Sequence, residues 1–361
     1  MKTRTIKVSW LTNLPAPYRI PIWNRLSKSF ELSVYSCLSE KNFRGWARPV
    51  NENWKHTFLS KWHIRLGEFD YVPNPMGFKK ILKGTDLLIV TGWESPIYIA
   101  AFIWAKLKKI PSINFYESTS SSHRFKGSLV RLVRRKIFNL ADYIVTSGSA
   151  STQAVVETGI SRKKIVELFN PVDVRFFSEY SNLHREKSGA GHRYLYVGQL
   201  IPRKNVLNAI RAFAQIANPD DSLTVVGDGP LRDQIRGLIQ ELNLVNQVKM
   251  MGHKNQEDLA FIYANSDTLV MPSINEVWGL VANEALASGA QVIASDVSGV
   301  SDFIKNMKGV YICTPEVESI ALRMNESRKN YAGPIKDPEI LKFTPERFAN
   351  ELLQLVKNGI K

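Results

Sequence analysis

The sequence predicts an α/β protein built from two doubly wound domains in series, and three observations lead to this fold class. Its 361 residues are too many for one domain and suit two domains of about 150 to 200 residues each. Short apolar runs alternate with helical stretches, as in βαβ units with parallel sheets. This alternation runs through the first half of the chain and starts again near residue 193.

The first domain is predicted over residues 1–172. Its strands are the apolar runs at 6–11, 32–37, 87–90, 112–116, 143–146 and 165–168. The segment 170–192 contains Pro171, Ser188, Gly189 and Gly191, so we expect a linker without secondary structure of its own and a hinge near residue 172.

The second domain is predicted over residues 173–342. Its strands are the runs at 193–197, 223–227, 248–252, 268–272, 291–295 and 310–313. Residues 343–361 are predicted to end in a helix, because Thr344 can cap it, Pro345 suits its first position and apolar residues recur from Phe348 onward. This helix can pack on either domain, including a return to the first.

Composition indicates a globular protein, with 44% hydrophobic and 22% charged residues. Cys37 and Cys313 lie far apart and lack metal-ligand spacing, which argues against a disulfide framework or a zinc site and favours a reducing cytoplasm. The amino end has no signal-peptide run, and the longest apolar run, at 98–105, is far shorter than the roughly 20 residues that span a bilayer. We therefore expect a cytoplasmic protein.

The positive charge is concentrated in the first half of the chain. Residues 1–170 contain 27 lysines and arginines against 11 aspartates and glutamates, whereas the rest of the chain is nearly neutral. Such a field attracts anionic lipid headgroups, phosphorylated substrates or nucleic acid, and it is also found on basic surfaces without a specific partner.

Within this half, the stretch 123–143 has the pattern of a basic amphipathic helix. Apolar Leu129, Leu132, Val133 and Phe138 stand among Arg131, Arg134, Arg135 and Lys136. Such a helix can rest on an anionic membrane, or its apolar face can pack on the sheet while its basic face is exposed to solvent without a partner. The two interpretations are compatible.

Residues 276–284, EVWGLVANE, place two carboxylates around a predicted helix start at the end of a strand. Five helical residues between Gly279 and Glu284 rise about 7.5 Å, so Glu276 and Glu284 can hold opposite ends of an elongated ligand. The free amides near Gly279 and Leu280 face anything negative between those ends. A nucleotide-sugar has this layout; the alternative is two solvated surface charges.

This E-x7-E segment and the ALASGAQVIASDVSGVSDFI that follows it resemble the donor-site motif of retaining glycosyltransferases of family 4. The resemblance covers nearly the whole chain and implies the GT-B fold, two Rossmann-like doubly wound domains whose parallel sheets face each other across a cleft. It also implies that the first domain binds the acceptor and the second the nucleotide-sugar, with UDP favoured. Glu276 would then hold the transferred sugar and Glu284 the ribose.

Other segments match the family in order. VGQLIPRKNVLNAIRAF (197–213) resembles the segment that carries two donor-phosphate cations, here Arg203 and Lys204, which would neutralise the departing diphosphate. VVGDGP (225–230) resembles the glycine turn beside the nucleotide. A solvated loop and an ordinary turn are the alternatives. The resemblance thus implies donor-binding residues Arg203, Lys204, Gly198, Gly227, Asp228, His253, Glu276, Trp278, Gly279, Leu280 and Glu284.

Two departures from the family pattern affect the predicted site. Gln199 stands where members often have an arginine, and Glu117 stands where many have a histidine over the reacting sugar. A carboxylate there can hold a sugar hydroxyl or stabilise an oxocarbenium-like transition state. Glu117 can equally be a buried partner of Arg124 or His123. With Glu117 included, the predicted catalytic residues are Glu276, Glu117, Arg203 and Lys204.

The first loop, residues 12–23, lacks the Gly-Gly pair that relatives use near the acceptor, and Asn13 and Arg19 are its candidate contacts. No Asp-x-Asp motif or His/Asp cluster with metal spacing occurs, so we expect no metal or other cofactor, with the two cations and a helix start in its place.

The predicted function is transfer of a sugar from a nucleotide-diphosphate sugar to a saccharide or lipid-linked acceptor, in surface polysaccharide, lipopolysaccharide or glycolipid assembly. We expect the enzyme in the cytoplasm or peripherally on the inner membrane face. A nucleotide-sugar 2-epimerase with the GT-B fold is one alternative. A non-enzymatic basic protein that binds membranes or nucleic acid is the other, although the chain has charge but no recognisable nucleic-acid module.

Overall fold

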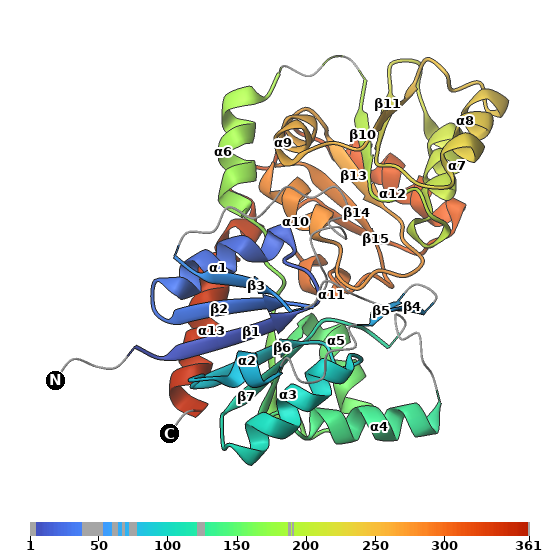
Figure 1. Cartoon of the computed structure of the whole chain (residues 1–361). Helices are drawn as coiled ribbons and strands as arrows, with labels where there is room; N and C mark the ends of the chain where they lie inside the picture. The colour runs from blue at the N-terminus through green and yellow to red at the C-terminus, as the bar shows by residue number, and fades with distance from the viewer. Residues whose placement is uncertain are drawn as a thin grey trace. The chain divides into compact units, whose positions relative to one another are not determined.

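A computed structural model describes residues 5–37, 53–59, 64–66, 69–71, 78–120, 127–186, 189 and 191–359. The chain forms two compact units. Unit 1 comprises Met1–Phe169 together with Pro345–Lys361, and unit 2 comprises Asn170–Thr344. Each unit has its own parallel sheet, which confirms the α/β prediction of two Rossmann-like domains (Figure 1).

The sheet of unit 1 has the strand order β3-β2-β1-β6-β7-β8-β9, and all its neighbouring strands are parallel. The order reverses between β1 and β6, because β1 pairs with both β2 and β6. The strands are β1 (Lys7–Thr12), β2 (Glu31–Ser36), β3 (Lys55–Phe58), β6 (Leu87–Thr91), β7 (Ser112–Tyr116), β8 (Tyr143–Ser147) and β9 (Ile165–Leu168). A separate antiparallel pair is formed by β4 (Ile64–Leu66) and β5 (Phe69–Tyr71).

Alternation of side chains along β1 builds two apolar layers in unit 1. Trp10 faces one side and packs edge-on against Trp23 of α1, with ring centroids 5.9 Å apart. Leu11 faces the other side and joins a cluster with Tyr98 and Phe102 of α3. The helices of this unit are α1 (Ile20–Ser27), α2 (Phe78–Leu82), α3 (Pro96–Leu107), α4 (Ser128–Phe138), α5 (Gly148–Val156) and α13 (Pro345–Gly359), with short 3-10 turns η1 (Pro17–Arg19) and η4 (Arg162–Lys164).

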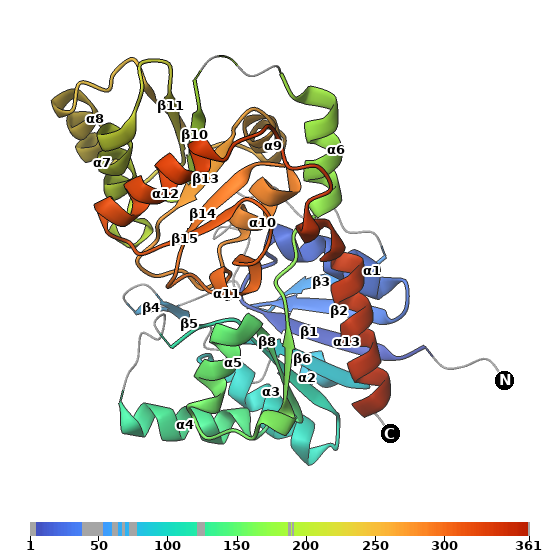
Figure 2. The ribbon, with the colours of Figure 1, turned by 180° about the vertical axis from the view of Figure 1, so that it is seen from behind.

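The final helix returns to unit 1. It begins at Pro345, and both views show it beside α1 and along the sheet (Figures 1 and 2). The fully buried ring of Phe348 lies 5.8 Å from the rings of both Phe115 and Phe169. Residues 345–359 therefore complete the core that residues 5–169 begin.

The sheet of unit 2 has the order β12-β11-β10-β13-β14-β15 and is also parallel throughout, with its reversal between β10 and β13. The strands are β10 (Arg193–Val197), β11 (Ser222–Val226), β12 (Val248–Gly252), β13 (Thr268–Met271), β14 (Gln291–Ser295) and β15 (Val310–Cys313). The helices are α6 (Val174–His184), α7 (Val206–Ile216), α8 (Arg232–Glu241), α9 (Gln256–Ala264), α10 (Leu280–Ala287), α11 (Ser301–Ile304) and α12 (Val317–Lys329), with 3-10 turns η5 (Pro202–Lys204) and η6 (Glu339–Lys342).

The prediction of an unstructured linker at 170–192 is wrong over about half of its length, because α6 occupies the 11 residues Val174–His184. Asp173 caps this helix, since its carboxylate accepts a hydrogen bond from the backbone N–H of Phe176 at 3.1 Å. The buried ring of Phe177 packs 5.8 Å from Tyr263 of α9. The units divide between residues 169 and 170, a little before the expected hinge at 172.

The basic helix predicted within 123–143 is α4, Ser128–Phe138, and residues 121–126 lie outside the described part. Its buried face carries Arg134, Ile137 and Phe138. Leu129, Leu132 and Val133 are 73%, 53% and 44% exposed, so these three apolar side chains do not pack on the sheet.

Within the described residues, no helix combines the length and the apolar character needed to cross a membrane. Cys37 and Cys313 are both buried free thiols.

Candidate functional site

In unit 2, the loops after β10 and β13 are fastened to each other where the strand order reverses. Asn205 adopts a left-handed conformation with φ 60°, and its side-chain amide donates to the carbonyls of Pro272 at 3.0 Å and Pro315 at 2.7 Å. The backbone N–H of Ile274 also donates to the carbonyl of Arg203 at 2.8 Å. The carboxyl ends of parallel strands at such a reversal are where ligands commonly bind in α/β sheets.

This fastening brings Lys204 and Glu276 together as an ion pair. Their side chains are 18% and 11% exposed, so the pair is largely shielded from water but still reaches the surface. The neighbouring Arg203 is exposed and donates to the carbonyl of Asn275 at 3.4 Å. Arg203 and Lys204, which the sequence predicted to share a site with Glu276, thus lie near it at one edge of the sheet, although at least 72 positions separate them from it in sequence.

The helix start between the two glutamates also forms as predicted from the motif. Gly279 has φ 106° and precedes α10, and a Cβ on it would lie 2.7 Å from the sulfur of Met271. Only glycine fits there without strain. Because Leu280 opens the helix, the first amides of α10 have no helical partner and carry the positive end of its dipole.

Trp278, which the resemblance placed in the donor site, is 2% exposed and packs against Phe303 with ring centroids 5.4 Å apart. Its carbonyl accepts a hydrogen bond from the backbone N–H of Val300 at 3.1 Å, and that of Glu276 accepts one from Gly299 at 3.0 Å. Trp278 is therefore a buried packing residue, and its contacts fix the loop that carries Glu276.

Glu284 lies about one turn into α10 and is held by Tyr263 of α9, whose hydroxyl donates to its carboxylate at 2.8 Å. Burial raises the pKa of the Glu284 carboxyl to about 7, while the hydrogen bond from Tyr263 opposes the rise. A carboxyl group in this state changes charge near neutral pH. Sequence reasoning missed Tyr263, since nothing in the α9 segment distinguishes it from an ordinary core tyrosine.

Two glycines allow the loops after β10 and β11 to touch backbone to backbone. Gly227 has φ 138°, and a Cβ on it would lie 1.8 Å from the carbonyl oxygen of Gly198. The amide of Gly227 donates to the carbonyl of Gly252 at 2.9 Å, which ties in the end of β12 as well. Asp228 and His253 follow these glycines and are exposed, and Asp228 pairs with Arg232 at 3.2 Å. All these residues therefore lie along the same edge as Lys204 and Glu276.

Unit 1 has a pocket of about 290 Å³ at the reversal point of its own sheet. Thr12 and Asn13 end β1, Thr91 and Gly92 end β6, and Glu117 follows β7 directly. Asn13, Arg19 and Glu117, predicted separately from the sequence, all line this pocket.

Arg19 forms an ion pair with Glu117 inside this pocket, with side-chain exposures of 5% and 17%. The same guanidinium donates to the hydroxyls of Thr91 at 2.9 Å and Thr12 at 3.3 Å. Burial is the largest single effect on the pKa of Arg19 and lowers it, but Glu117, Tyr18 and Tyr98 together outweigh burial and raise that pKa. The proposed partners His123 and Arg124 lie outside the described residues, and the sequence did not anticipate Arg19 in this role.

The chemistry of both sites is that of hydroxyl and anion recognition. Each offers a carboxylate beside a cation, and unit 2 adds free helix amides. In the described part of the chain, no group of three or more His, Cys, Asp or Glu side chains is arranged to hold a metal ion.

Comparison with known proteins adds to this geometry. Residues 184–338, most of unit 2, match the family model "Glycosyl transferases group 1". An uncharacterized glycosyltransferase of Methanocaldococcus jannaschii is 33% identical over 129 residues, 35% of this chain and 33% of that protein. The N-acetyl-alpha-D-glucosaminyl L-malate synthase of Bacillus anthracis is 30% identical over 156 residues, 42% of this chain and 40% of that protein. The chain thus spans less than half the length of either relative.

Solved structures resemble the chain along nearly its whole length. Anabaena HepE in complex with UDP has a TM-score of 0.74 at 16% identity, covering 98% of this chain and 100% of that one. A glycosyltransferase from Rickettsia africae has a TM-score of 0.76 at 15% identity, covering 99% and 100%. These likenesses establish the two-domain GT-B fold. The family match adds that residues 184–338 resemble glycosyl transferases of group 1.

Proposed function

We propose that this chain is a retaining glycosyltransferase of family 4 that transfers a hexose from a nucleotide-diphosphate sugar to a saccharide or lipid-linked acceptor. The observation that carries the proposal is the Lys204–Glu276 ion pair, which lies beside Arg203 and just before the first turn of α10. UDP is the favoured nucleotide, which agrees with the UDP bound to HepE.

On binding, the donor would separate this ion pair and supply new hydrogen-bond partners to both of its residues. Its diphosphate would bind Lys204, Arg203 and the first amides of α10, which leaves the carboxylate of Glu276 to accept hydrogen bonds from hydroxyls of the transferred sugar. As the bond between the sugar and the diphosphate breaks, negative charge grows on the leaving oxygen, and the fixed cations stabilise it. In this proposal no metal ion is needed at that step.

The rest of the nucleotide would lie along the same edge of unit 2. Glu284, held by Tyr263, would accept hydrogen bonds from the ribose hydroxyls. The loops that Gly198 and Gly227 bring into backbone contact would lie beside the nucleotide, and the exposed Asp228 and His253 would contribute to the choice of base. An ionised Glu284 accepts hydrogen bonds from hydroxyls more strongly than a protonated one, so its titration near neutral pH bears on donor affinity.

The acceptor would bind in the unit 1 pocket, where Asn13, Arg19 and Glu117 supply donors and acceptors for sugar hydroxyls. A carboxylate at Glu117 would also stabilise positive charge that develops on the transferred sugar. The exposed Leu129, Leu132 and Val133 of α4, next to basic side chains, support peripheral contact with an anionic membrane. A lipid-linked acceptor for surface polysaccharide or glycolipid assembly suits that placement.

Replacement of Glu276 by glutamine tests the proposal. With UDP-glucose or another UDP-sugar and a lipid-linked saccharide mixture, the wild-type chain should form a glycosylated product. Glu276→Gln should lose at least about 100-fold in turnover. The exposed Glu241→Gln on α8 is the matched control and should keep full activity. Turnover by Glu276→Gln equal to that of the control would exclude the proposed role.

Three further measurements complete the test. The double variant Glu276→Gln/Lys204→Gln removes the unpaired cation, so its circular dichroism and melting temperature show whether lost activity reflects lost folding. Analysis of reactions without acceptor distinguishes transfer from epimerisation, because a 2-epimerase would release nucleotide and free epimerised sugar there. Thermal-shift screening against UDP, GDP and ADP sugars identifies the nucleotide.

A further inference from the structure

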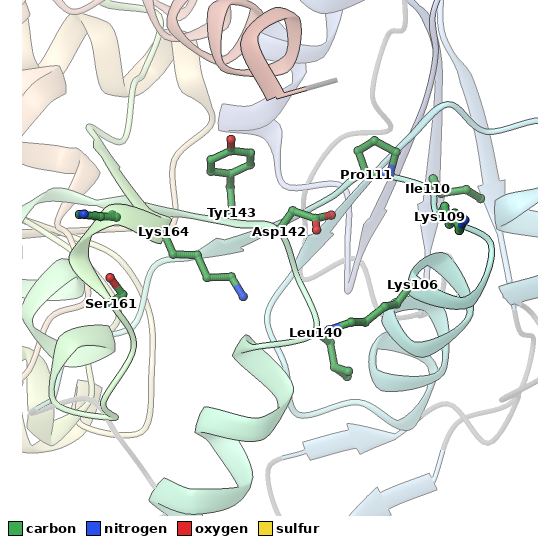
Figure 3. Close-up of a pocket in the computed structure, with 10 residues that line it drawn as sticks. Lys106, Lys109, Ile110, Pro111, Leu140, Asp142, Tyr143, Ser161 and Lys164 are labelled. Carbon is green, nitrogen blue, oxygen red and sulfur yellow. The ribbon is translucent and has the colours of Figure 1, made fainter. Parts of the chain in front are cut away.

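A second pocket in unit 1, of about 580 Å³, lies at the amino ends of its strands (Figure 3). Pro111 and Asp142 immediately precede β7 and β8, and Lys106 and Lys109 come from the end of α3. The 3-10 turn η4, at the start of β9, contributes the remaining lysines, Lys163 and Lys164. Segments far apart in sequence thus place four lysines around one hollow.

The positive charge of this pocket is not balanced within it. Asp142 is the carboxylate among its lining residues, and it already accepts hydrogen bonds from the backbone N–H of Ser112 at 2.7 Å and its hydroxyl at 3.2 Å. Within the described residues, none of the four lysines forms an ion pair. Figure 3 shows the side chains of Lys106 and Lys164 reaching toward each other from opposite sides.

The clustered positive charge of this pocket affects Lys164 in particular. Its side chain is half-buried, and its ammonium group donates to the carbonyl of Asn139 at 3.2 Å. Burial lowers the pKa of Lys164, and the nearby charge of Lys106 lowers it further, against the opposing effect of Asp142. An added anion would relieve both the repulsion and the incomplete solvation of this lysine.

Lys109 lines the same pocket from an uncommon backbone conformation. It has φ 55°, just beyond the carboxyl end of α3, a left-handed position at which glycine or asparagine is usual. A lysine there pays a conformational cost that glycine would avoid, while its side chain lines the pocket.

We propose that this lysine-lined pocket binds a phosphate-bearing ligand. Its volume accommodates a phosphorylated sugar or a lipid headgroup rather than a bare ion alone. The site is separate from the acceptor pocket of the same unit, because β7 begins beside one and ends beside the other, five residues or about 16 Å apart. A ligand here would leave Arg19 and Glu117 unobstructed, so the inference does not depend on the proposed transferase activity.

The test uses the full chain, inorganic pyrophosphate as probe and chloride at equal ionic strength as reference. Because unit 2 is also proposed to bind phosphate, both wild type and Lys204→Gln are measured. Pyrophosphate should raise the melting temperature of both proteins, since a ligand of the folded state stabilises it. In the Lys204→Gln background, where the proposed phosphate site of unit 2 is weakened, Lys106→Gln/Lys164→Gln should weaken pyrophosphate affinity about tenfold or more; in the wild-type background it should reduce the shift in melting temperature. The charge-matched control Lys79→Gln/Lys80→Gln, on exposed lysines of α2, should not.

A single variant, Lys109→Gly, adds a readout that a purely structural role would not give. It should raise the melting temperature without ligand, because glycine suits the left-handed conformation, and yet reduce the shift that pyrophosphate produces.

Flotation with phosphatidylcholine vesicles, with and without phosphatidic acid, identifies the source of the phosphate. A pyrophosphate response that the double variant loses supports a soluble ligand. Flotation that requires phosphatidic acid and is lost in the double variant, without a pyrophosphate response, supports a lipid headgroup. Equal behaviour of wild type, double variant and control in both assays, or no response in either, would overturn the inference.

Discussion

The guanidinium of Arg19 and the carboxylate of Glu117 form an ion pair within unit 1, although 98 residues separate them in sequence. Arg19 follows β1 and Glu117 follows β7, so the pair joins loops at two strand ends on either side of β6. Its two side chains are the charged groups that face each other in the candidate acceptor pocket.

Replacing Glu117 with alanine should lower the free energy of unfolding of the chain by about 3 kcal/mol, because a buried guanidinium loses its charge partner. The double variant Arg19→Ala/Glu117→Ala should cost less than the sum of the two single changes. Urea denaturation measures all three. Glu31→Ala is the matched control, since its ion pair with Lys7 at 3.3 Å is nearly half exposed, and its cost should stay below about 1 kcal/mol. Equal costs for Glu117→Ala and Glu31→Ala would contradict a stabilising role for the buried pair.

Replacing Lys204 with glutamine should weaken UDP binding about tenfold and reduce turnover by about 100-fold, because a cation that stabilises the leaving group is lost. Isothermal titration with UDP and initial rates with the UDP-sugar give the two quantities. Lys249→Gln, an exposed change on β12 of the same unit, should alter neither. If both variants bind UDP like wild type, Lys204 is not a phosphate ligand.

Replacing Gly227 with alanine should destabilise unit 2 by several kcal/mol and abolish UDP binding, because the new methyl group would lie 1.8 Å from the carbonyl oxygen of Gly198. The control is Gly237→Ala within α8, where the added Cβ meets nothing within 4 Å. That change should stabilise the helix by about 0.5–1 kcal/mol. Thermal unfolding of both variants measures whether the stability falls for Gly227→Ala and rises for Gly237→Ala. Unchanged stability of Gly227→Ala would mean that the two loops can separate.

Replacing Glu284 with glutamine should change stability in a pH-dependent way. The folded-state pKa of about 7 lies above the ordinary carboxyl value of 4.5, so the folded chain binds an extra proton between these values and loses stability as the pH rises through them. Glu284→Gln removes this loss and should be more stable than wild type at pH 8, by up to about 3 kcal/mol. Below about pH 4.5 the difference should vanish.

Urea denaturation at pH 4.5 and pH 8 measures the effect, with the exposed Glu241→Gln as reference. A difference that is the same at both pH values would show that folding does not shift the pKa of Glu284. The same variant should also bind UDP more weakly at pH 8, where only the wild-type carboxylate can accept both ribose hydroxyls.

Treatment with EDTA should leave the rate of sugar transfer unchanged within about twofold, because Arg203, Lys204 and the start of α10 are proposed to act where other enzymes use a divalent cation. Rates before chelation, after chelation and after added Mg²⁺ are compared on the same preparation. A rate that falls on chelation and returns with Mg²⁺ would show that a metal takes part.

The strands that pair deep within each sheet could be predicted because they are short apolar runs. The edge strand β3, KHTF, could not, since its residues are half-exposed or exposed and carry no apolar run. Helix α6 was missed because the proline and glycines around it suggested a linker, although Asp173 was a readable cap. In the candidate site, Arg203, Lys204 and Glu276 could be predicted because the segments that carry them match the family's motifs in order.

The pairing of side chains from distant segments could not be predicted from the sequence. Nothing in a single sequence connects Arg19 to Glu117 or Tyr263 to Glu284, because these pairings depend on which strands become neighbours in the sheet. The pocket lined by Lys106 and Lys164 was likewise visible only as part of a general basic excess in the first half of the chain.

The return of α13 to unit 1 has a consequence for how the chain is made. Unit 2 is continuous in sequence and can close as soon as Thr344 has left the ribosome, whereas unit 1 must wait for Phe348 to fill the space beside Phe115 and Phe169. Until then the earlier-synthesised half exposes an apolar surface, a state in which aggregation competes with folding. All residues of unit 2 are therefore synthesised before the helix that completes unit 1.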